Sequence, residues 1–346
     1  MTFVLDGPVL PDALVTFVRQ VPVPATFMLN QILPDRYFTR NDVVFTELTR
    51  VNRTARFRAY DARLHVSERD TFTDKQVKMP ALSSSISVGE LERLNLEFAR
   101  TAGTNRAALV EAIYNDATNL TREVQARMEL ARGNVLSSGT FALAAEGGIT
   151  QTADYGVPGG NFVAPSTLWS DITNSKPITD MLSWVDSYVA VNGFAPGSMI
   201  LNRATLHLLQ RNAEVRQYFA TLIGTVDVIT QQQLSTVLMS LGLPDIQFVY
   251  DTKVDVDGTT TNCIPGNKVV FLPPNPSDLG FTAWGVSATA LELMRSNAVD
   301  MAFEDAPGIV AVVDRDGPPY REFTYVDAVG MPVIQQPRYL MVGTVS

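Results

Sequence analysis

The fold of this chain is decided by residues 104–132, which read TNRAALVEAIYNDATNLTREVQARMELAR. Apolar side chains recur here every three or four positions, the spacing that places them on one face of an α-helix. That face consists of Leu109, Ile113, Ala117, Leu120, Val124, Met128, Ala131 and, just beyond the stretch, Val135. At 1.5 Å per residue the helix would be roughly 45 Å long. It is either the core helix of an α/β enzyme or the strut of an elongated subunit.

Both ends of this stretch carry residues that favour the ends of helices. Thr104 can cap the first turn with its hydroxyl oxygen, and Gly133 can adopt the left-handed backbone that often follows a last turn. Arg132 lies in the last turn, where the helix dipole stabilises a cation. No proline interrupts the stretch, so we expect one unbroken helix that ends before Gly133.

The composition excludes several classes of protein. A chain of 346 residues with 46% hydrophobic content can fold into more than one domain. Its first 20 residues lack the basic start of a secretory signal, and no apolar run is long enough to span a membrane. The single cysteine, Cys263, excludes an internal disulfide and a cysteine-rich zinc site. Because no basic residue accompanies it, we expect Cys263 to be unreactive.

The charge of the chain is distributed unevenly. Residues 50–78 contain eight basic and four acidic side chains, so this segment carries +4 and the remainder carries −13 of the total of −9. The basic residues are Arg50, Arg53, Arg56, Arg58, Arg63, Arg69, Lys75 and Lys78. A basic projection on an acidic body can dock onto another copy of the molecule. The alternatives are a solvated hairpin and an arm that binds nucleic acid, which the overall negative charge disfavours.

The first half of the chain contains segments that are expected to project. Residues 1–49 contain five prolines and predict an extended arm with a few helical turns at 10–19, too poor in contacts to bury itself. Residues 50–80 alternate apolar and polar side chains and predict a long hairpin, which needs a partner surface for stability. A short helix is expected at 87–102, and a strand, a turn and a second strand at 137–157.

The second half predicts short helices and strands in alternation. The expected helices are 177–190, 206–210, 215–222, 231–241 and a short element at 289–295. The expected strands are 198–201, 246–250, 268–272, 309–313, 323–329 and 338–345. Thr230 and Gln233 form the pattern of a capping box, and Asp257-Gly258 is a strong hairpin turn.

We find no catalytic, cofactor or metal motif. His65 and His207 lack a serine, cysteine or histidine partner at a catalytic or metal-binding spacing. Asp251, Asp255 and Asp257 resemble a calcium loop, but the required glutamate would fall on Ile264. The glycines at 156–160 lack the Gly-Lys-Ser/Thr ending of a phosphate-binding loop. The expectation is a non-enzymatic protein with no cofactor and no metal.

Several short motifs follow one another in a characteristic order. In the first half they are Met79-Pro80-Ala81-Leu82, the run from Glu129 to Gly133, Gly139, and Gly147-Gly148-Ile149. In the second half they are Pro177-Ile178-Thr179-Asp180, Gly193 to Pro196, Met199 to Asn202, Ile264 to Val270, Leu279 to Gly285, and Pro307-Gly308-Ile309. In this order and spacing they resemble the lambda-type capsid protein E family of tailed bacteriophages, which has the Hong Kong 97 fold.

The resemblance implies an α+β architecture with four parts. These are an N-terminal arm (1–49), an E-loop (50–82), a peripheral P-domain (83–165 and 300–346) with the long helix as its spine, and an axial A-domain (166–299). The eight basic residues of 50–78 would then contact a neighbouring subunit. The residues that pack the spine helix would be Leu109, Ile113, Leu120, Val124 and Met128.

The resemblance also implies a function. Copies would form hexamers and pentamers of an icosahedral head that encloses double-stranded DNA without reading its sequence. Expected partners are a separate scaffolding protein, a portal, a maturation protease and a decoration protein, with assembly in the bacterial cytoplasm, final location in the virion and no membrane. Some relatives crosslink an E-loop lysine to an asparagine; nothing identifies a matching asparagine for Lys75 or Lys78. The alternatives are an encapsulin-like compartment of the same fold and a soluble α/β enzyme.

Overall fold

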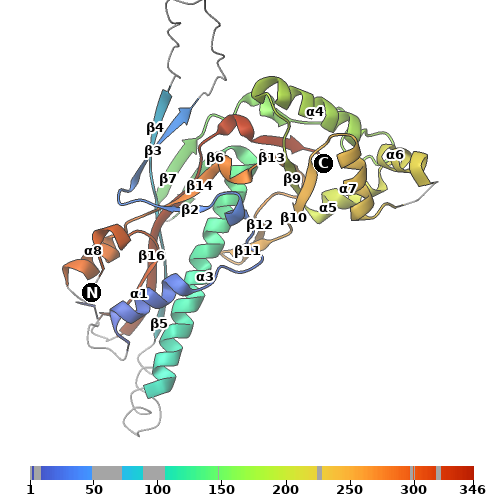
Figure 1. Ribbon diagram of the computed structural model, residues 1–346. Coiled ribbons are helices and arrows are strands. Elements are labelled where there is room, and N and C mark those ends of the chain that lie inside the picture. The colour runs from blue at the N-terminus through green and yellow to red at the C-terminus, as the bar shows by residue number, and fades with distance from the viewer. Residues whose placement is uncertain are drawn as a thin grey trace, which may run out of the picture.

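The computed structural model describes most of the chain. The described residues are 2–3, 9–48, 72–88, 106–146, 148–223, 228–296, 299, 301–316 and 321–346. They form two lobes that lie side by side along one long helix, and a strand pair projects from the first lobe (Figure 1). The predicted mixture of helices and sheets is confirmed.

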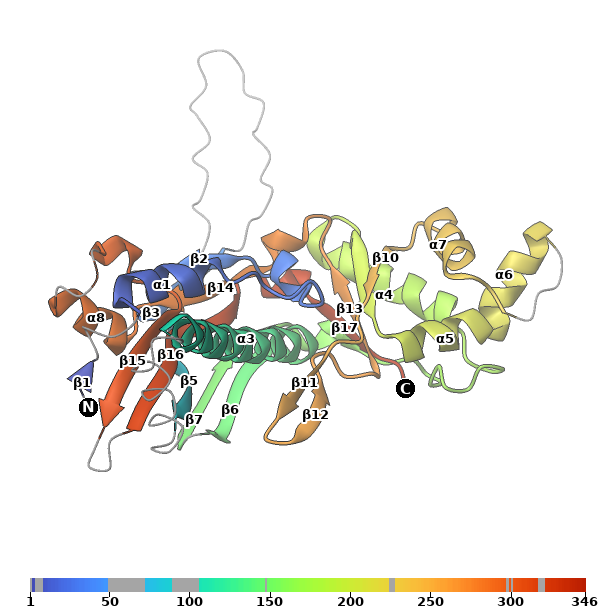
Figure 2. The same ribbon diagram turned by 90° about the horizontal axis from the view of Figure 1, so that it is seen from below.

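Helix α3, Arg106–Ser138, is the longest element and extends from the first lobe to the second (Figure 2). Its 33 residues correspond to roughly 50 Å. The predicted cap Thr104 lies outside the described residues.

The prediction that the helix ends before Gly133 is wrong. Gly133 lies inside α3, where a Cβ atom would overlap the main-chain carbonyl of Cys263, so glycine is needed for the close approach of that loop. The helix ends instead at Gly139, which has a left-handed backbone (φ 71°) and donates its N–H to the carbonyl of Val135 at 2.8 Å.

The first lobe is built on a six-stranded sheet. Its strands are β1 (Thr2–Phe3), β2 (Asp35–Tyr37), β5 (Ala81–Val88), β14 (Gly280–Gly285), β15 (Val310–Asp316) and β16 (Arg321–Ile334). The order is β1-β15-β16-β14-β2, with β5 antiparallel to β16 along its other edge. Helix α3 covers one face, against Ala311 and Val326, and α8 (Ala288–Arg295) covers the other, against Val310 and Val312.

The second lobe is built on a five-stranded sheet in the order β10-β9-β13-β17-β8. These strands are β8 (Phe162–Val163), β9 (Ser198–Leu201), β10 (Asp245–Val249), β13 (Lys268–Leu272) and β17 (Met341–Thr344). The helices around it are α4 (Pro177–Asn192), α5 (Arg203–Arg211), α6 (Ala213–Ile223) and α7 (Gln231–Ser240). The predicted capping box of Thr230 and Gln233 is present at the start of α7.

Three separate hairpins complete the fold. They are β3–β4 (Asp42–Leu48 and Phe72–Lys78), β6–β7 (Thr140–Glu146 and Ile149–Asp154) and β11–β12 (Lys253–Val256 and Thr259–Asn262). The predicted turn at Asp257-Gly258 is confirmed, with positive φ at both residues (51° and 81°). Short 3-10 turns lie at η1 (Leu29–Gln31), η2 (Gly159–Asn161), η3 (Pro276–Asp278), η4 (Phe303–Asp305) and η5 (Pro337–Tyr339).

Two expectations about the first half are corrected by the structure. Residues 9–38 do not lie apart from their own chain: α1 (Pro11–Gln20) and the turn η1 place Leu14, Leu29 and Ile32 at 1% exposure or less. The prolines divide the arm into segments too short to show a hydrophobic period in the sequence. These segments nevertheless bury apolar side chains against the rest of the chain. The helix expected at 87–102 is wrong at its start, because β5 continues through Val88; residues 89–105 lie outside the described part.

Candidate assembly interface

The strand pair β3–β4 projects from the first lobe (Figure 1). Its strands pair antiparallel over seven residues each, from Asp42 opposite Lys78 to Leu48 opposite Phe72. The hairpin therefore begins at Asp42, eight residues before the predicted start at residue 50. The main chain between the two strands, residues 49–71, lies outside the described part, and with it six of the eight predicted basic contact residues, Arg50 to Arg69. Lys75 lies on β4, and Lys78 is exposed at the end of that strand.

The root of this hairpin is held by hydrogen bonds in which side chains bond the main chain, and by one bond between main-chain groups. The Asn41 side chain donates to the carbonyl of Val286 at 2.8 Å and accepts from its N–H at 2.9 Å, while Met79 N–H donates to the Asn41 carbonyl. The Gln151 side chain on β7 donates to the Lys78 carbonyl at 2.5 Å. Val43 and Met79 are buried at 2% and 7% exposure. The base of the projection is thus fixed to both the six-stranded sheet and the hairpin β6–β7.

Helix α3 packs against α1 and the six-stranded sheet. Four of its five predicted packing residues, Ile113, Leu120, Val124 and Met128, are buried in one cluster with α1 and the six-stranded sheet. The side chain of the fifth, Leu109, lies outside the described part. The helix is therefore packed over most of its length and can act as a stiff support.

A cluster of buried charged side chains joins α3 to both lobes. The Glu129 carboxylate, fully buried, accepts from the N–H of Leu29 at 2.9 Å, the hydroxyl of Tyr250 at 2.6 Å and the guanidinium of Arg132 at 3.2 Å. Arg132 also donates to Asp35 at 2.7 Å and to Thr282 at 2.8 Å. We call Asp35, Glu129 and Arg132 the charge cluster. It links the arm, the spine-like helix, β14 and, through Tyr250, the second lobe.

Burial sets the protonation of the hydroxyl in this cluster. Removal from water raises the pKa of Tyr250, and the neighbouring Glu129 carboxylate raises it further. Tyr250 therefore stays neutral, and its hydroxyl donates a hydrogen bond to Glu129. In the sequence, Glu129 stands out only as part of a family pattern, and Arg132 also as a cation in a last helical turn, a position that is wrong because α3 continues to Ser138. Their spacing of three on the apolar side of a helix is the one sequence signal of a buried pair, whereas nothing in sequence connects them to Asp35.

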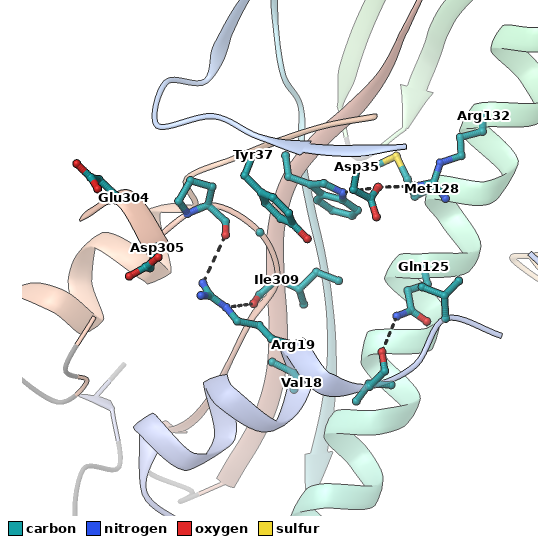
Figure 3. Close-up of a pocket in the computed structure, with 15 residues that line it drawn as sticks. Val18, Arg19, Asp35, Tyr37, Gln125, Met128, Arg132, Glu304, Asp305 and Ile309 are labelled. Atoms are coloured by element: carbon teal, nitrogen blue, oxygen red, sulfur yellow. Dashed lines mark hydrogen bonds and ion pairs between the residues drawn. The ribbon is translucent and has the colours of Figure 1, made fainter. Parts of the chain in front are cut away.

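A cavity of about 370 Å³ opens beside this cluster, between α1, α3, β2 and the loop 303–309 (Figure 3). We call it the α1–α3 pocket. Its inner wall includes Met128, Arg132 and Trp284, and its mouth carries Arg19 and Tyr37. Burial lowers the pKa of Arg19, which donates to the carbonyls of Pro307 and Ile309 at 3.5 and 3.4 Å.

A larger groove of about 950 Å³ lies between α3, β5 and the hairpin β11–β12. Charges of both signs line it in equal number: Arg122, Arg127 and Lys253 against Glu123, Asp255 and Asp257. Glu123 accepts from the Ser84 hydroxyl, and Asp255 accepts from the N–H of Gly258. This balance gives the groove no preference for a charged partner.

Two of the residues considered for chemistry, His207 and Asp251, are exposed. His207 is exposed on α5, and Asp251 is paired with Arg203 at 3.0 Å; His65 lies outside the described part. Burial raises the pKa of the Cys263 thiol to about 11. In the described part of the chain, no group of His, Cys, Asp and Glu is arranged to hold a metal ion. Nor does any helix in that part have the length and apolarity to cross a membrane.

The chain is similar in sequence to one protein family and in fold to several solved structures. The model of a family described as phage major capsid protein E matches residues 11–345. A crystal structure of a capsid protein assigned to a prophage of E. coli CFT073 superposes with a TM-score of 0.63, at 16% identity over 98% of this chain and 99% of the other. A phage-related protein of Bordetella bronchiseptica RB50 gives 0.55, at 13% identity over 97% and 96%. Both likenesses concern the fold. No curated protein matches the sequence.

Proposed function

This chain belongs to the phage major capsid protein E family, and from that premise we propose that its copies assemble as hexamers and pentamers into an icosahedral head around double-stranded DNA. The family is one of structural capsid proteins, and the chain has the phage capsid fold. The observation that carries the proposal is the family match, which covers residues 11–345 and so includes both lobes and the projecting hairpin.

The geometry supports a role in contacts between copies. A hairpin that leaves its own body needs a second surface for stability, and its root at Asn41 and Met79 is fixed by hydrogen bonds and burial. In the proposal, the hairpin from Asp42 to Lys78 acts as the E-loop and its basic side chains contact a neighbouring subunit. The first lobe corresponds to the P-domain and the second lobe to the A-domain around the axis of each hexamer or pentamer. The bounds expected from the sequence need correction, because β14 and α8 pack in the first lobe although they fall within 166–299, whereas β8 and β17 belong to the sheet of the second lobe.

The charge of the subunit suits a container for DNA. Outside residues 50–78 the chain carries −13, so a shell of such subunits repels rather than grips the phosphate backbone. Release of the genome then requires no strong protein–DNA contact to be broken. The proposal includes a separate scaffolding protein, a portal, a maturation protease and a decoration protein, assembly in the host cytoplasm and a final place in the virion.

The test is the size of the assembled protein. The subunit would be expressed alone and together with the genes beside it, and each sample examined by sedimentation velocity and negative-stain electron microscopy. We expect closed shells or sheets of hexamers. Shells that contain a protein cargo in place of DNA in infected cells would contradict the proposal, as would a stable monomer in both expression conditions.

A loop replacement isolates the contribution of the hairpin. Residues 49–71 would be replaced by Asn-Gly, which preserves the pairing of Leu48 with Phe72 and joins them by a two-residue turn. We expect a folded subunit with an unchanged thermal midpoint and no closed shells. The matched control keeps the loop but changes its six arginines to glutamine. Intact shells from the loop replacement would contradict the role of this segment.

A further inference from the structure

The α1–α3 pocket contains a buried polar atom that the protein leaves unpaired. Gln125 on α3 is 8% exposed and its side-chain N–H donates to the carbonyl of Val21 at 3.4 Å. Its carbonyl oxygen, Oε1, is buried and has no donor within the described residues. An unsatisfied buried acceptor is uncommon in folded proteins. A group that enters the pocket and donates a hydrogen bond would satisfy it.

The charges around the pocket favour a cation. Asp35, Glu304 and Asp305 line it together with Arg19 and Arg132. Arg132 is already paired with Asp35 and with Glu129 behind the wall. Asp305 lies on the side of Arg19 (Figure 3), while Glu304 is exposed on the rim and makes no hydrogen bond or ion pair with any residue that the structure describes. Three carboxylates and two guanidinium groups therefore line the pocket.

The pocket offers one exposed aromatic surface. Tyr37 lines it and is 64% exposed. The ring of Tyr37 lies against Gly308, where a Cβ atom would come within 3.2 Å of it, so the ring is held in place. A planar guanidinium stacks well on such a ring. The same lobe already contains this arrangement, since Arg36 lies over the ring of Phe281 at 4.5 Å.

We propose that this pocket receives an arginine side chain from residues 50–69 of a second copy of the chain. Arginine alone combines a positive charge, a planar face for Tyr37 and several N–H donors for Gln125 Oε1 and Glu304. The segment 50–69 contains six arginines within a region of charge +4. The strands β3 and β4, which precede and follow this segment in the chain, lead away from the body (Figure 1). The inference rests on the proposed shell function and adds the place and the chemistry of the contact.

Cysteine pairing between two different subunits tests the contact. One variant carries Glu304→Cys at the rim, and a second set carries Arg53→Cys, Arg56→Cys, Arg58→Cys or Arg63→Cys, one at a time. The two are mixed, assembled, oxidised and run on a non-reducing gel. The natural Cys263 is buried, so wild-type protein provides the background. The matched control for Glu304→Cys is Val191→Cys, exposed on α4 in the other lobe.

We expect a linked dimer from Glu304→Cys with one or two of the loop variants, at least tenfold above the Val191→Cys control. Shells without that dimer would overturn the pocket contact and leave the shell function intact. The dimer without closed shells would support the contact and count against the shell function. Absence of both the dimer and the shells would overturn both the pocket contact and the shell function. A variant that carries both cysteines in one chain completes the test. A link formed only within that single chain would show that the loop enters its own pocket, and this result also overturns the proposal.

Charge reversal gives a second, independent readout. Glu304→Lys on an exposed position should leave the thermal midpoint unchanged but lower the yield of assembled protein at least fivefold. A double variant combines Glu304→Lys with Arg→Glu at the loop position found by crosslinking, and it should restore the yield of assembled protein. The control is Asp186→Lys, the same charge change on an exposed position of α4. Equal assembly of the two lysine variants would contradict the proposal.

Discussion

The two lobes of the molecule are built in different ways. In the second lobe, helices α4, α5 and α7 end or begin at local signals: Gly193 in a left-handed backbone, Asn202 as a cap for Thr205, and the capping box of Thr230. In the first lobe, the sheet brings together strands from residues 2–3, 35–37, 81–88, 280–285 and 310–334. The charge cluster joins residues 97 positions apart, Asp35 and Arg132.

This difference predicts which substitutions should lower the stability of the protein most. A local signal stabilises only one end of a helix. When it is removed, the packing of the rest of that helix still holds the helix in place, so the loss of stability is small. A buried charge that connects distant segments leaves several partners unsatisfied when it is removed. Substitutions in the first lobe around α3 should therefore cost more than matched substitutions in the second lobe.

The largest effect is expected from Leu120→Asp. Leu120 is fully buried between α3, α1 and the six-stranded sheet, and an unpaired carboxylate there has no partner. We expect no soluble folded subunit, measured as soluble yield and circular dichroism. Asn119→Asp, one residue away on the exposed side of the same helix, should fold normally. A folded Leu120→Asp protein would show that the packing of α3 is dispensable.

The next largest is expected from Glu129→Ala. The change leaves Arg132 without its buried partner and the N–H of Leu29 without an acceptor, so the free energy of unfolding should fall by about 3–5 kcal/mol. The matched variant in the second lobe is Arg203→Ala, which removes the exposed pair with Asp251 and should cost less than about 1 kcal/mol. Urea unfolding measures both; equal losses would remove the contrast between the lobes.

A smaller loss of stability is expected from Gly133→Ala, opposite in sign to the effect of this change in an ordinary helix. Within an ordinary helix this change stabilises by about 1 kcal/mol. Here the new methyl group would overlap the carbonyl of Cys263, so we expect a lower thermal midpoint. Gly159→Ala, at a position with open space around it, serves as the control and should leave the midpoint unchanged. A stabilised Gly133→Ala protein would mean that the loop at Cys263 is free to move away.

The smallest effect is expected from Thr230→Ala. It removes the side-chain acceptor for the N–H of Gln233 in the capping box and should cost about 1 kcal/mol. Hydrogen exchange should speed up in the first turn of α7 and remain unchanged in α3. Exchange that increases in both helices would show that the lobes unfold as one unit and that the local description of the second lobe is incomplete.

Much of the second lobe could be predicted from the sequence. The strands at 198–201 and 268–272 and the helix that ends at Gly193 were found at their observed positions, because apolar runs and glycine stops act over a few residues. The fully buried strand β14 was missed, since Gly280–Gly285 has no alternation to mark it. Strand β5 was missed because its three serines in a row look like a loop, although they pair with β16.

What the sequence by itself determined is the set of local structures: the helix that became α3, the capped helices, the Asp257-Gly258 turn and the uneven charge. What only the tertiary structure decided is how distant segments meet. The burial of residues 9–38, the place of Gly133 inside α3, the charge cluster and the α1–α3 pocket each depend on contacts between residues far apart in the chain. Such contacts have no sequence period, so they become visible only when the chain is folded.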